Sequence, residues 1–174
     1  MEQHIEIATP AGPMDAFVAR PDEGERHPAI IIWMDIWGLR AELEDIARRV
    51  AGHGYCAILP NEYYRQGRVR FEFRDDKGRM RSMDTLSQDI QDGLREQMFK
   101  LTDAMVVDDA RAILAWLDAS GFAPGPVGSI GYCMGGRHAL AVAGHLTERF
   151  RATACLHGTR LVTDSPDSVH RLGE

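Results

Sequence analysis

The sequence predicts an α/β protein built on a mostly parallel sheet flanked by helices. The apolar, β-branched run 29–33 (AIIIW) is typical of a strand that is buried on both faces of a parallel sheet. From this run onward, strand-like and helix-like segments alternate, which favours right-handed β-α-β units. A chain of 174 residues is long enough for one domain with a substantial core. We therefore expect a single domain over residues 1–174.

Each element follows from a local pattern, beginning with an N-terminal hairpin. The segments HIEIAT and MDAFVAR, separated by two prolines and a glycine, predict two paired strands. After the run 29–33, an amphipathic helix is expected around 41–51 because its apolar residues recur on one face, and two glycines end it. The run 55–60 (YCAILP) predicts a second buried strand, which ends at Pro60.

The second half of the chain continues this alternation. Residues 61–83 form a long polar stretch, and a loop of this length in a compact domain is usually functional or mobile. A helix is expected over about 84–99, and a stronger one begins at Thr102 as its N-cap and ends at Gly121. The patterns that follow predict a strand, a helix and a further strand at 126–131, 136–146 and 152–158.

Composition excludes several classes of protein. A formal net charge of −6 argues against a nucleic-acid binder, which would need a basic face to neutralise phosphates. No apolar run approaches the ~20 residues of a membrane span, and the acidic start MEQHIEIATP predicts no signal peptide. Three widely spaced cysteines without a C-x-x-C pair suit a reducing cytosol and predict no metal site. We therefore expect a cytoplasmic protein without a metal site or cofactor, while its oligomeric state stays open.

The segment GYCMGG (131–136) has the pattern of a nucleophile elbow. In a G-x-S-x-G elbow the strand turns sharply into a helix, with the nucleophile at the strained apex. Flanking glycines are needed because a side chain at either place would clash with the neighbouring backbone. Here Cys133 takes the place of the nucleophile, and the N-terminus of the next helix is expected to stabilise its thiolate. Cys56 and Cys155 lie inside predicted strands, so we interpret both as core residues.

With this elbow the chain resembles the dienelactone hydrolases (carboxymethylenebutenolidases) of the α/β-hydrolase fold over essentially its whole length. GYCMGG is the most specific match, because most relatives of this fold carry serine there. MDIWGL (34–39) is similar to an E-I-F-G-like segment of the family, and REQMFKL (95–101) is similar to its R-E-Q-x-x-K-L segment. The resemblance implies hydrolysis of a carboxylate-bearing lactone or ester, as in the degradation of aromatic compounds.

The resemblance also implies a role for each matched position. Cys133 would attack the carbonyl carbon, and the backbone N–H groups of Ile36 and Met134 would form the oxyanion hole. Arg95 would bind the substrate carboxylate, a task that suits a guanidinium fork. Asp35 takes the place of a family glutamate that helps to control thiol ionisation, and it is one methylene shorter. Asp35 could instead cap the following helix, and Arg95 could be a solvated helix residue.

The base and its orienting acid remain open at this point. A cysteine hydrolase needs both, and in the α/β-hydrolase order they follow the nucleophile. His138 and His145 fall within the helix after the elbow and are poor candidates, whereas His157 ends a predicted strand at the same sheet edge as the elbow. Family chains continue to a further strand with the acid and a loop with the histidine, so we expect a hydrolase domain that is incomplete at its C-terminus. The other candidates within the chain are His170, Asp164 and Asp167.

Two other functions remain open beside hydrolysis. An incomplete domain could bind a carboxylate ligand without catalysis, and Cys133 could act as a redox sensor. Turnover that depends on Cys133 would favour the enzyme. The arginines of 61–83 are interleaved with acidic residues, so we interpret them as a solvated loop surface. They are Arg65, Arg68, Arg70, Arg74, Arg79 and Arg81.

Overall fold

A computed structural model of the chain describes residues 1–22, 26–67, 71, 73–123 and 125–173. The strands within these residues are β1 (Glu2–Thr9), β2 (Gly12–Ala19), β3 (Ala29–Trp33), β4 (Cys56–Pro60), β5 (Val127–Tyr132) and β6 (Phe150–Leu156). They form one mixed sheet in the order β1-β2-β4-β3-β5-β6. β3 runs parallel to β4 and β5, and β5 runs parallel to β6, whereas the β1–β2 hairpin joins β4 in antiparallel pairing. The predicted mostly parallel sheet is therefore confirmed.

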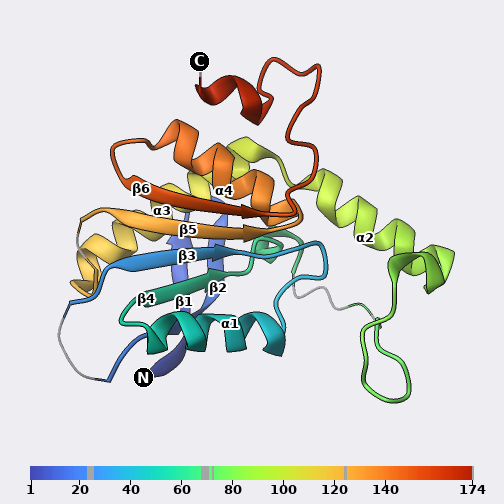
Figure 1. Cartoon of the computed structure of the whole chain (residues 1–174), viewed down its shortest axis with the longest axis horizontal. Coiled ribbons are helices and arrows are strands. Elements are labelled where there is room, and N and C mark those ends of the chain that lie inside the picture. Colours follow the sequence, from blue (N-terminus) through green and yellow to red (C-terminus); the bar gives the residue numbers. More distant parts are fainter. Residues whose placement is uncertain (23–25, 68–70, 72, 124, 174) are drawn as a thin grey trace.

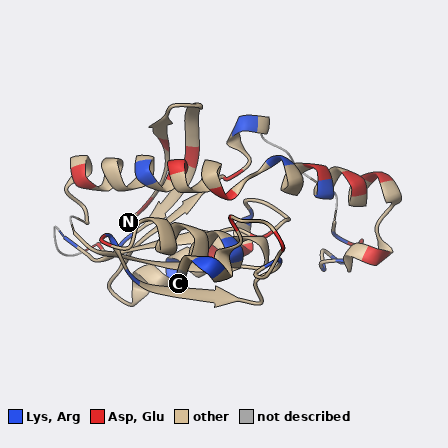
Figure 2. Cartoon of the chain, turned by 90° about the horizontal axis from the view of Figure 1, so that it is seen from above, with Lys and Arg blue, Asp and Glu red and all other residues tan. Residues whose placement is uncertain are grey.

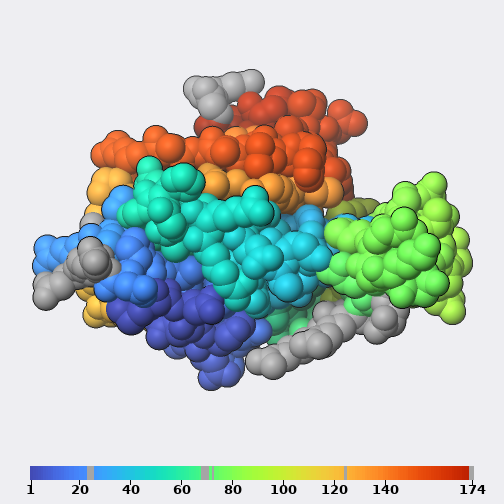
Figure 3. All heavy atoms as spheres, turned by 60° about the horizontal axis from the view of Figure 1, so that its bottom comes forward, coloured from blue at the N-terminus to red at the C-terminus, as the bar shows by residue number. Residues whose placement is uncertain are grey.

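Helices cover both faces of the sheet. α1 (Ala41–Gly52) packs on one face against β2 and β4, while α4 (Met134–His145) packs on the other against β5 and β6, together with α3 (Asp103–Ser120) (Figure 1). α2 (Gln88–Lys100) extends away from the sheet at the end where β3 and β5 stop. Figure 3 shows α1 over the middle of its face and α2 projecting at one end. Within the described part of the chain, no helix is long and apolar enough to cross a membrane.

The predicted alternation of elements is confirmed, with shifts at some element ends. The hairpin, the first buried strand and the first helix lie where the sequence places them. The helix predicted over about 84–99 begins only at Gln88, because Met83–Thr85 form a separate 3₁₀ turn before it. The helix predicted over 136–146 begins earlier, at Met134, since it starts directly after the elbow. The remaining 3₁₀ turns are Tyr64–Gln66 and Val169–Gly173.

Both predicted ends of α3 are confirmed. The Thr102 hydroxyl accepts a hydrogen bond from the backbone N–H of Met105 at 3.3 Å, so it satisfies one of the free donors of the first turn. Gly121 follows the helix in the left-handed region with φ 71°, which is the usual conformation after a helix end. These two local signals define the longest helix of the described chain.

The core lies between the sheet and the helices on its two faces. Ile31, Ile32 and Trp33 of β3 are fully buried, as expected of a central parallel strand. Cys56 in β4 is buried as well, which confirms its interpretation as a core residue. Cys155 is only half-buried because β6 is the outermost strand, so the core interpretation is wrong for this residue.

The arginines of 61–83 do not all belong to a solvated surface. Arg65 is half-buried and binds both carboxylate oxygens of Asp109 at 2.8 Å, and Asp109 is itself buried in α3. The interpretation as a solvated residue is therefore wrong for Arg65. It is confirmed for Arg79, which is exposed and pairs with Asp75 on the same loop. Arg68 and Arg70 lie outside the described residues.

β6 forms one outer edge of the sheet, and no further strand of the described chain pairs with it. Ala152, Ala154 and Leu156 are exposed along this strand. Arg151 is its charged residue, and the β6 arrow is otherwise tan in Figure 2, in contrast to the interspersed charges of α2 and α3. An unpaired apolar strand is a template for pairing with another chain.

We therefore expect the chain to associate through β6. Its apparent mass should rise with protein concentration in size-exclusion chromatography with light scattering. Ala154→Lys should reduce this association, because a lysine blunts an edge strand, and should lower the binding of an apolar-surface dye. Ala11→Lys, at an exposed position in the turn between β1 and β2, is the matched control. A parent chain that stays monomeric at every concentration would contradict the expectation.

Candidate active site

The turn from β5 into α4 has the geometry of a nucleophile elbow. Cys133 follows β5 directly and occupies the N-cap of α4 with φ 54° and ψ −112°. A non-glycine residue with positive φ is uncommon, and such strained residues cluster at functional sites. The elbow lies at the carboxyl end of the central strands, where open parallel sheets hold their sites. The strand–elbow–helix arrangement predicted for residues 131–136 is thus confirmed.

Two glycines make the close approach at the elbow possible. A Cβ on Gly131 would lie 1.9 Å from the carbonyl oxygen of Gly135. A Cβ on Gly135 would lie 2.4 Å from the carbonyl oxygen of Trp33 and 2.5 Å from that of Met34. The first turn of α4 therefore touches the backbone at the end of β3, and no side chain fits between them.

The segment after β3 holds the second predicted oxyanion donor. The side chain of Ile36 is buried in a small apolar cluster that includes Leu94 of α2. Its carbonyl oxygen accepts a hydrogen bond from the Tyr63 hydroxyl at 3.1 Å, and the same hydroxyl lies 3.6 Å from the Met134 sulfur. Within the described residues no oxygen accepts the N–H of Ile36. The structure thus links the segments that carry Ile36 and Met134 through one tyrosine.

The Cys133 thiol is half-buried, and the backbone N–H of Met134 and the Thr159 hydroxyl act to lower its pKa. Burial nevertheless raises the pKa of the thiol above its ordinary value of 9.0, and the charge of Asp35 raises it further. The expected stabilisation of a thiolate is therefore outweighed, and the resting thiol is protonated at neutral pH. Sequence reasoning missed Thr159, although its place just after a predicted strand at the elbow edge is a usable signal.

Asp35 binds Arg40 and not the thiol. Its two oxygens accept hydrogen bonds of 2.7 Å from Nη1 and Nη2 of Arg40, and Oδ1 also accepts the backbone N–H of Trp37 at 3.0 Å. Arg40 is the N-cap residue of α1, which has no side-chain cap bond, so the alternative that Asp35 caps this helix is wrong. Asp35 acts on Cys133 through its charge.

His157 is the histidine that the structure places beside the elbow. Its Nδ1 accepts the backbone N–H of Cys133 at 3.0 Å, and its backbone has φ 43°. This confirms its predicted location at the elbow edge. No carboxylate of the described residues binds its ring. By contrast, His138 is buried against Glu62, and His170 bonds a neighbouring serine. A search of the described residues finds no group of three or more His, Cys, Asp or Glu that could hold a metal ion.

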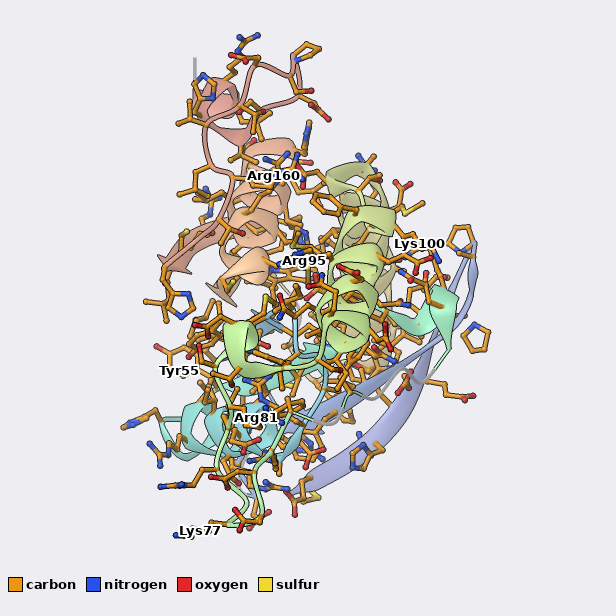
Figure 4. All side chains as sticks on the ribbon, turned by 90° about the vertical axis from the view of Figure 1, so that its right-hand side faces the viewer. Tyr55, Lys77, Arg81, Arg95, Lys100 and Arg160 are labelled. Atoms are coloured by element: carbon orange, nitrogen blue, oxygen red, sulfur yellow. The ribbon has the colours of Figure 1, made fainter. Side chains whose placement is uncertain are left out.

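Arg95 lies on α2, next to the buried Leu94. Its guanidinium lies 3.2 Å from Oδ1 of Asp92 and 3.1 Å from Oε1 of Gln91, both on the same helix, and its side chain is exposed. In the view of Figure 4 the labelled side chain lies between the ribbons of α2 and α4. The structure thus shows Arg95 as an exposed residue paired within its own helix.

A cavity of about 280 Å³ lies between the first turn of α4 and the C-terminal end of α2, and neither Cys133 nor Arg95 is among its lining residues. Met134 and Thr159 line it on the elbow side, and Met98 of α2 lines it one turn after Arg95. Pockets for small molecules have volumes of about 300–1,000 Å³, so this cavity suits a small ligand. The elbow and the helix that carries Arg95 thus share one hollow.

We expect Cys133 to react with iodoacetamide before Cys56 and Cys155 in the folded chain. Its sulfur lies at a helix N-terminus, whereas Cys56 is fully buried and burial raises its pKa to about 11. Because the pKa of Cys133 is also above 9.0, the thiolate fraction and the rate should keep rising with pH beyond that value. Peptide mass spectrometry after one equivalent of reagent, at several pH values, measures both. Faster labelling of Cys155, or a rate that levels off near neutral pH, would contradict this.

The fold and the elbow together define an α/β hydrolase. The parallel centre of the sheet, the strained residue after β5 and the helix that begins directly after it are the arrangement of this class. A model of the dienelactone hydrolase family matches residues 14–171. The chain belongs to the dienelactone hydrolase family.

Individual relatives agree with this assignment. The chain is 33% identical over 162 residues to a "Putative carboxymethylenebutenolidase" of Methylorubrum extorquens, covering 92% of this chain and 50% of the relative. It is 29% identical over 133 residues to the carboxymethylenebutenolidase of Pseudomonas sp. strain P51, covering 76% and 50%. A solved structure, the "Putative Dienelactone Hydrolase" of Klebsiella pneumoniae, matches with a TM-score of 0.76 and 25% identity, covering 97% of this chain and 64% of that one. The chain spans about half the length of the curated relatives that it matches.

Proposed function

We propose that the chain cleaves a carboxylate-bearing lactone or ester of the dienelactone type through a thioester on Cys133. The observation that carries the proposal is the strained backbone at Cys133, which sets this residue at the apex of the turn from β5 into α4. A residue held at such an apex is exposed to a carbonyl group from the sheet edge. Membership of the dienelactone hydrolase family supports the substrate class.

The proposed step begins with loss of the Cys133 proton. The sulfur attacks the carbonyl carbon, and the charge that develops on the carbonyl oxygen is stabilised by the N–H groups of Ile36 and Met134. Collapse of this intermediate breaks the C–O bond and forms the thioester, while the leaving oxygen takes up the proton; an ester loses its alcohol here, whereas a lactone keeps the hydroxyl on the acyl group. Attack of water on the thioester carbonyl then releases the acid and returns a proton to the sulfur. His157 is our candidate for the base, because its ring bonds the Cys133 backbone. Burial and the charge of Asp35 raise the pKa of the thiol, so it starts the reaction protonated and a base must take its proton.

Substrate charge tests this function through Arg95. Arg95→Ala should slow thioester formation with an acidic lactone about tenfold to a hundredfold, since a charge-assisted hydrogen bond contributes about 1.5–3 kcal/mol. The methyl ester of the same lactone should react at an unchanged rate. The growth of the Cys133 adduct in intact-protein mass spectra measures both rates.

Arg111→Ala is the matched control for this test. Arg111 is an exposed arginine of α3 that pairs with Asp108 three residues before it, just as Arg95 pairs with Asp92. It should leave both rates unchanged. If Arg95→Ala slows the acid and the methyl ester equally, Arg95 belongs to the solvated surface and the proposed carboxylate site is wrong.

A second function is favoured by one observation at the same site. The ring of His157 has no carboxylate partner among the described residues, so nothing there orients or charges it as a base. A chain that binds a carboxylate ligand, or is acylated without release, fits this arrangement. Ligand binding without sustained hydrolysis would support this alternative.

A further inference from the structure

Behind the elbow lie a buried carboxylate and a buried imidazole that the proposed reaction does not use. The side chain of Glu62 is 1% exposed and that of His138 is 3% exposed, with Oε1 of Glu62 2.5 Å from Nδ1 of His138. Burying ionisable groups is costly unless they are paired and hydrogen-bonded. Burial accordingly raises the pKa of Glu62, while His138 acts in the opposite direction. Apolar side chains would fill the same space at a lower cost, so the role of Glu62 and His138 is to be found in their hydrogen bonds.

The second carboxylate oxygen of Glu62 connects this pair to the segment after β3. Oε2 accepts the backbone N–H of Met34 at 2.8 Å, two residues before the predicted donor Ile36. His138 lies one helical turn after Met134, which carries the other predicted donor. One carboxylate therefore bonds the backbone of the segment after β3 and a side chain of α4, the two elements that carry the predicted oxyanion donors.

We propose that Glu62 is a positioning residue that sets the separation of the two oxyanion-hole donors by tying Met34 to His138. The inference rests on the proposed acyl transfer at Cys133. Donors are effective at about 2.7–3.1 Å from the developing charge, and a misplacement of about 1 Å can cost a hundredfold in rate. The two oxygens of Glu62 fix this separation from within the core, where solvent does not compete for its hydrogen bonds.

Two reactions of Cys133 separate positioning from general stability. Acylation by p-nitrophenyl acetate develops an oxyanion, whereas alkylation by iodoacetamide does not. Glu62→Leu should therefore slow acylation about tenfold to a hundredfold and change alkylation by no more than about twofold. Glu62→Gln should retain most of the acylation rate, because its amide can accept from Met34 and donate to His138. Glu62→Asp keeps the charge but is too short to reach both partners, so it should show the same loss of acylation. It takes the place of Glu62→Leu in the test if Glu62→Leu does not fold.

Asp109→Asn is the matched control. Asp109 is equally buried and paired, with Arg65 and the Tyr64 hydroxyl, but it has no bond to the segment after β3. It should destabilise the chain while leaving the ratio of acylation to alkylation unchanged. An unchanged ratio in both Glu62→Leu and Glu62→Asp would overturn the positioning role.

Hydrogen exchange gives a readout that does not depend on acylation. The amides of Met34 and its neighbours up to Trp37 should exchange faster in Glu62→Leu or Glu62→Asp than in the parent or in Asp109→Asn. If the parent is not acylated at Cys133, the proposed function fails, while faster exchange confined to this segment would still support the positioning role. Unchanged exchange there would overturn that role, whatever the parent does with esters.

Discussion

Mixed with excess p-nitrophenyl acetate, the chain is expected to release about one equivalent of nitrophenolate and then stop. The first step needs the Cys133 sulfur, the two N–H donors and a group that takes the thiol proton. The second step needs a water molecule activated by a base, and the ring of His157 lacks an orienting carboxylate among the described residues. Stopped-flow absorbance gives the burst, and mass spectrometry should locate the acetyl group on Cys133.

Three variants test which side chains produce the burst. Cys133→Ala should remove it entirely, since no other described cysteine lies at a helix-opening turn. His157→Ala should slow the burst, because His157 is the candidate base, whereas His170→Ala should leave it unchanged, because the His170 ring bonds Ser168. Sustained turnover in the parent that is lost in either histidine variant would show that the chain contains its own base, and the expectation of an incomplete domain would be wrong.

Gly135→Ala is expected to destabilise the chain by about 3 kcal/mol or more, at the upper end of the range for overpacking. The added Cβ would meet the carbonyl oxygens of Trp33 and Met34 at 2.4 and 2.5 Å, and these are backbone atoms that no rotamer change can move. For a chain of this size the melting temperature should fall by about 6–12 °C. Thermal unfolding followed by circular dichroism measures the change, and burst acylation of any folded fraction should fall as well.

Gly52→Ala provides the control for Gly135→Ala. A Cβ at Gly52, at the end of α1, would meet nothing within 4 Å. Alanine is also the better helix former, so this variant should be neutral or stabilised by up to about 1 kcal/mol. If both alanine variants melt at the parent temperature, the elbow can relax and the close approach at β3 is not required.

Local patterns account for the part of the site that the sequence predicts. A glycine on each side of Cys133, a β-branched strand before it and an apolar helix after it are all contiguous, so they indicate the elbow without knowledge of the rest of the fold. The environment of the Cys133 thiol cannot be predicted from contiguous residues in this way. Its raised pKa depends on burial and on the position of Asp35, which come from packing between β3, β5 and their loops.

The buried pair shows most clearly what the sequence does not reveal. Glu62 lies in a stretch whose sequence is polar, so nothing local indicates that it is buried together with Asn61 and Tyr63. His138 lies in a helix where a lone histidine is easily taken for a core residue. Their contact joins residues from two distant elements, and no spacing within either element indicates it. The pairing of Asp35 with Arg40 is nearer in sequence, yet it depends on a turn with Gly38 at φ 79°.

The parallel pairing of β3 with β5 also has a consequence for how the chain acquires its reactivity. Ala29 pairs with Val127, so the two backbone segments that would hold an oxyanion come from sites about a hundred residues apart in sequence. Contacts of such long separation must close a large loop before they gain any stabilisation, which places them among the slower events of folding. During synthesis Cys133 is therefore an ordinary flexible thiol without donors around it. Its reactivity toward esters arises only when the central strands have paired. The rate at which acylation appears during refolding therefore measures how fast the sheet is completed.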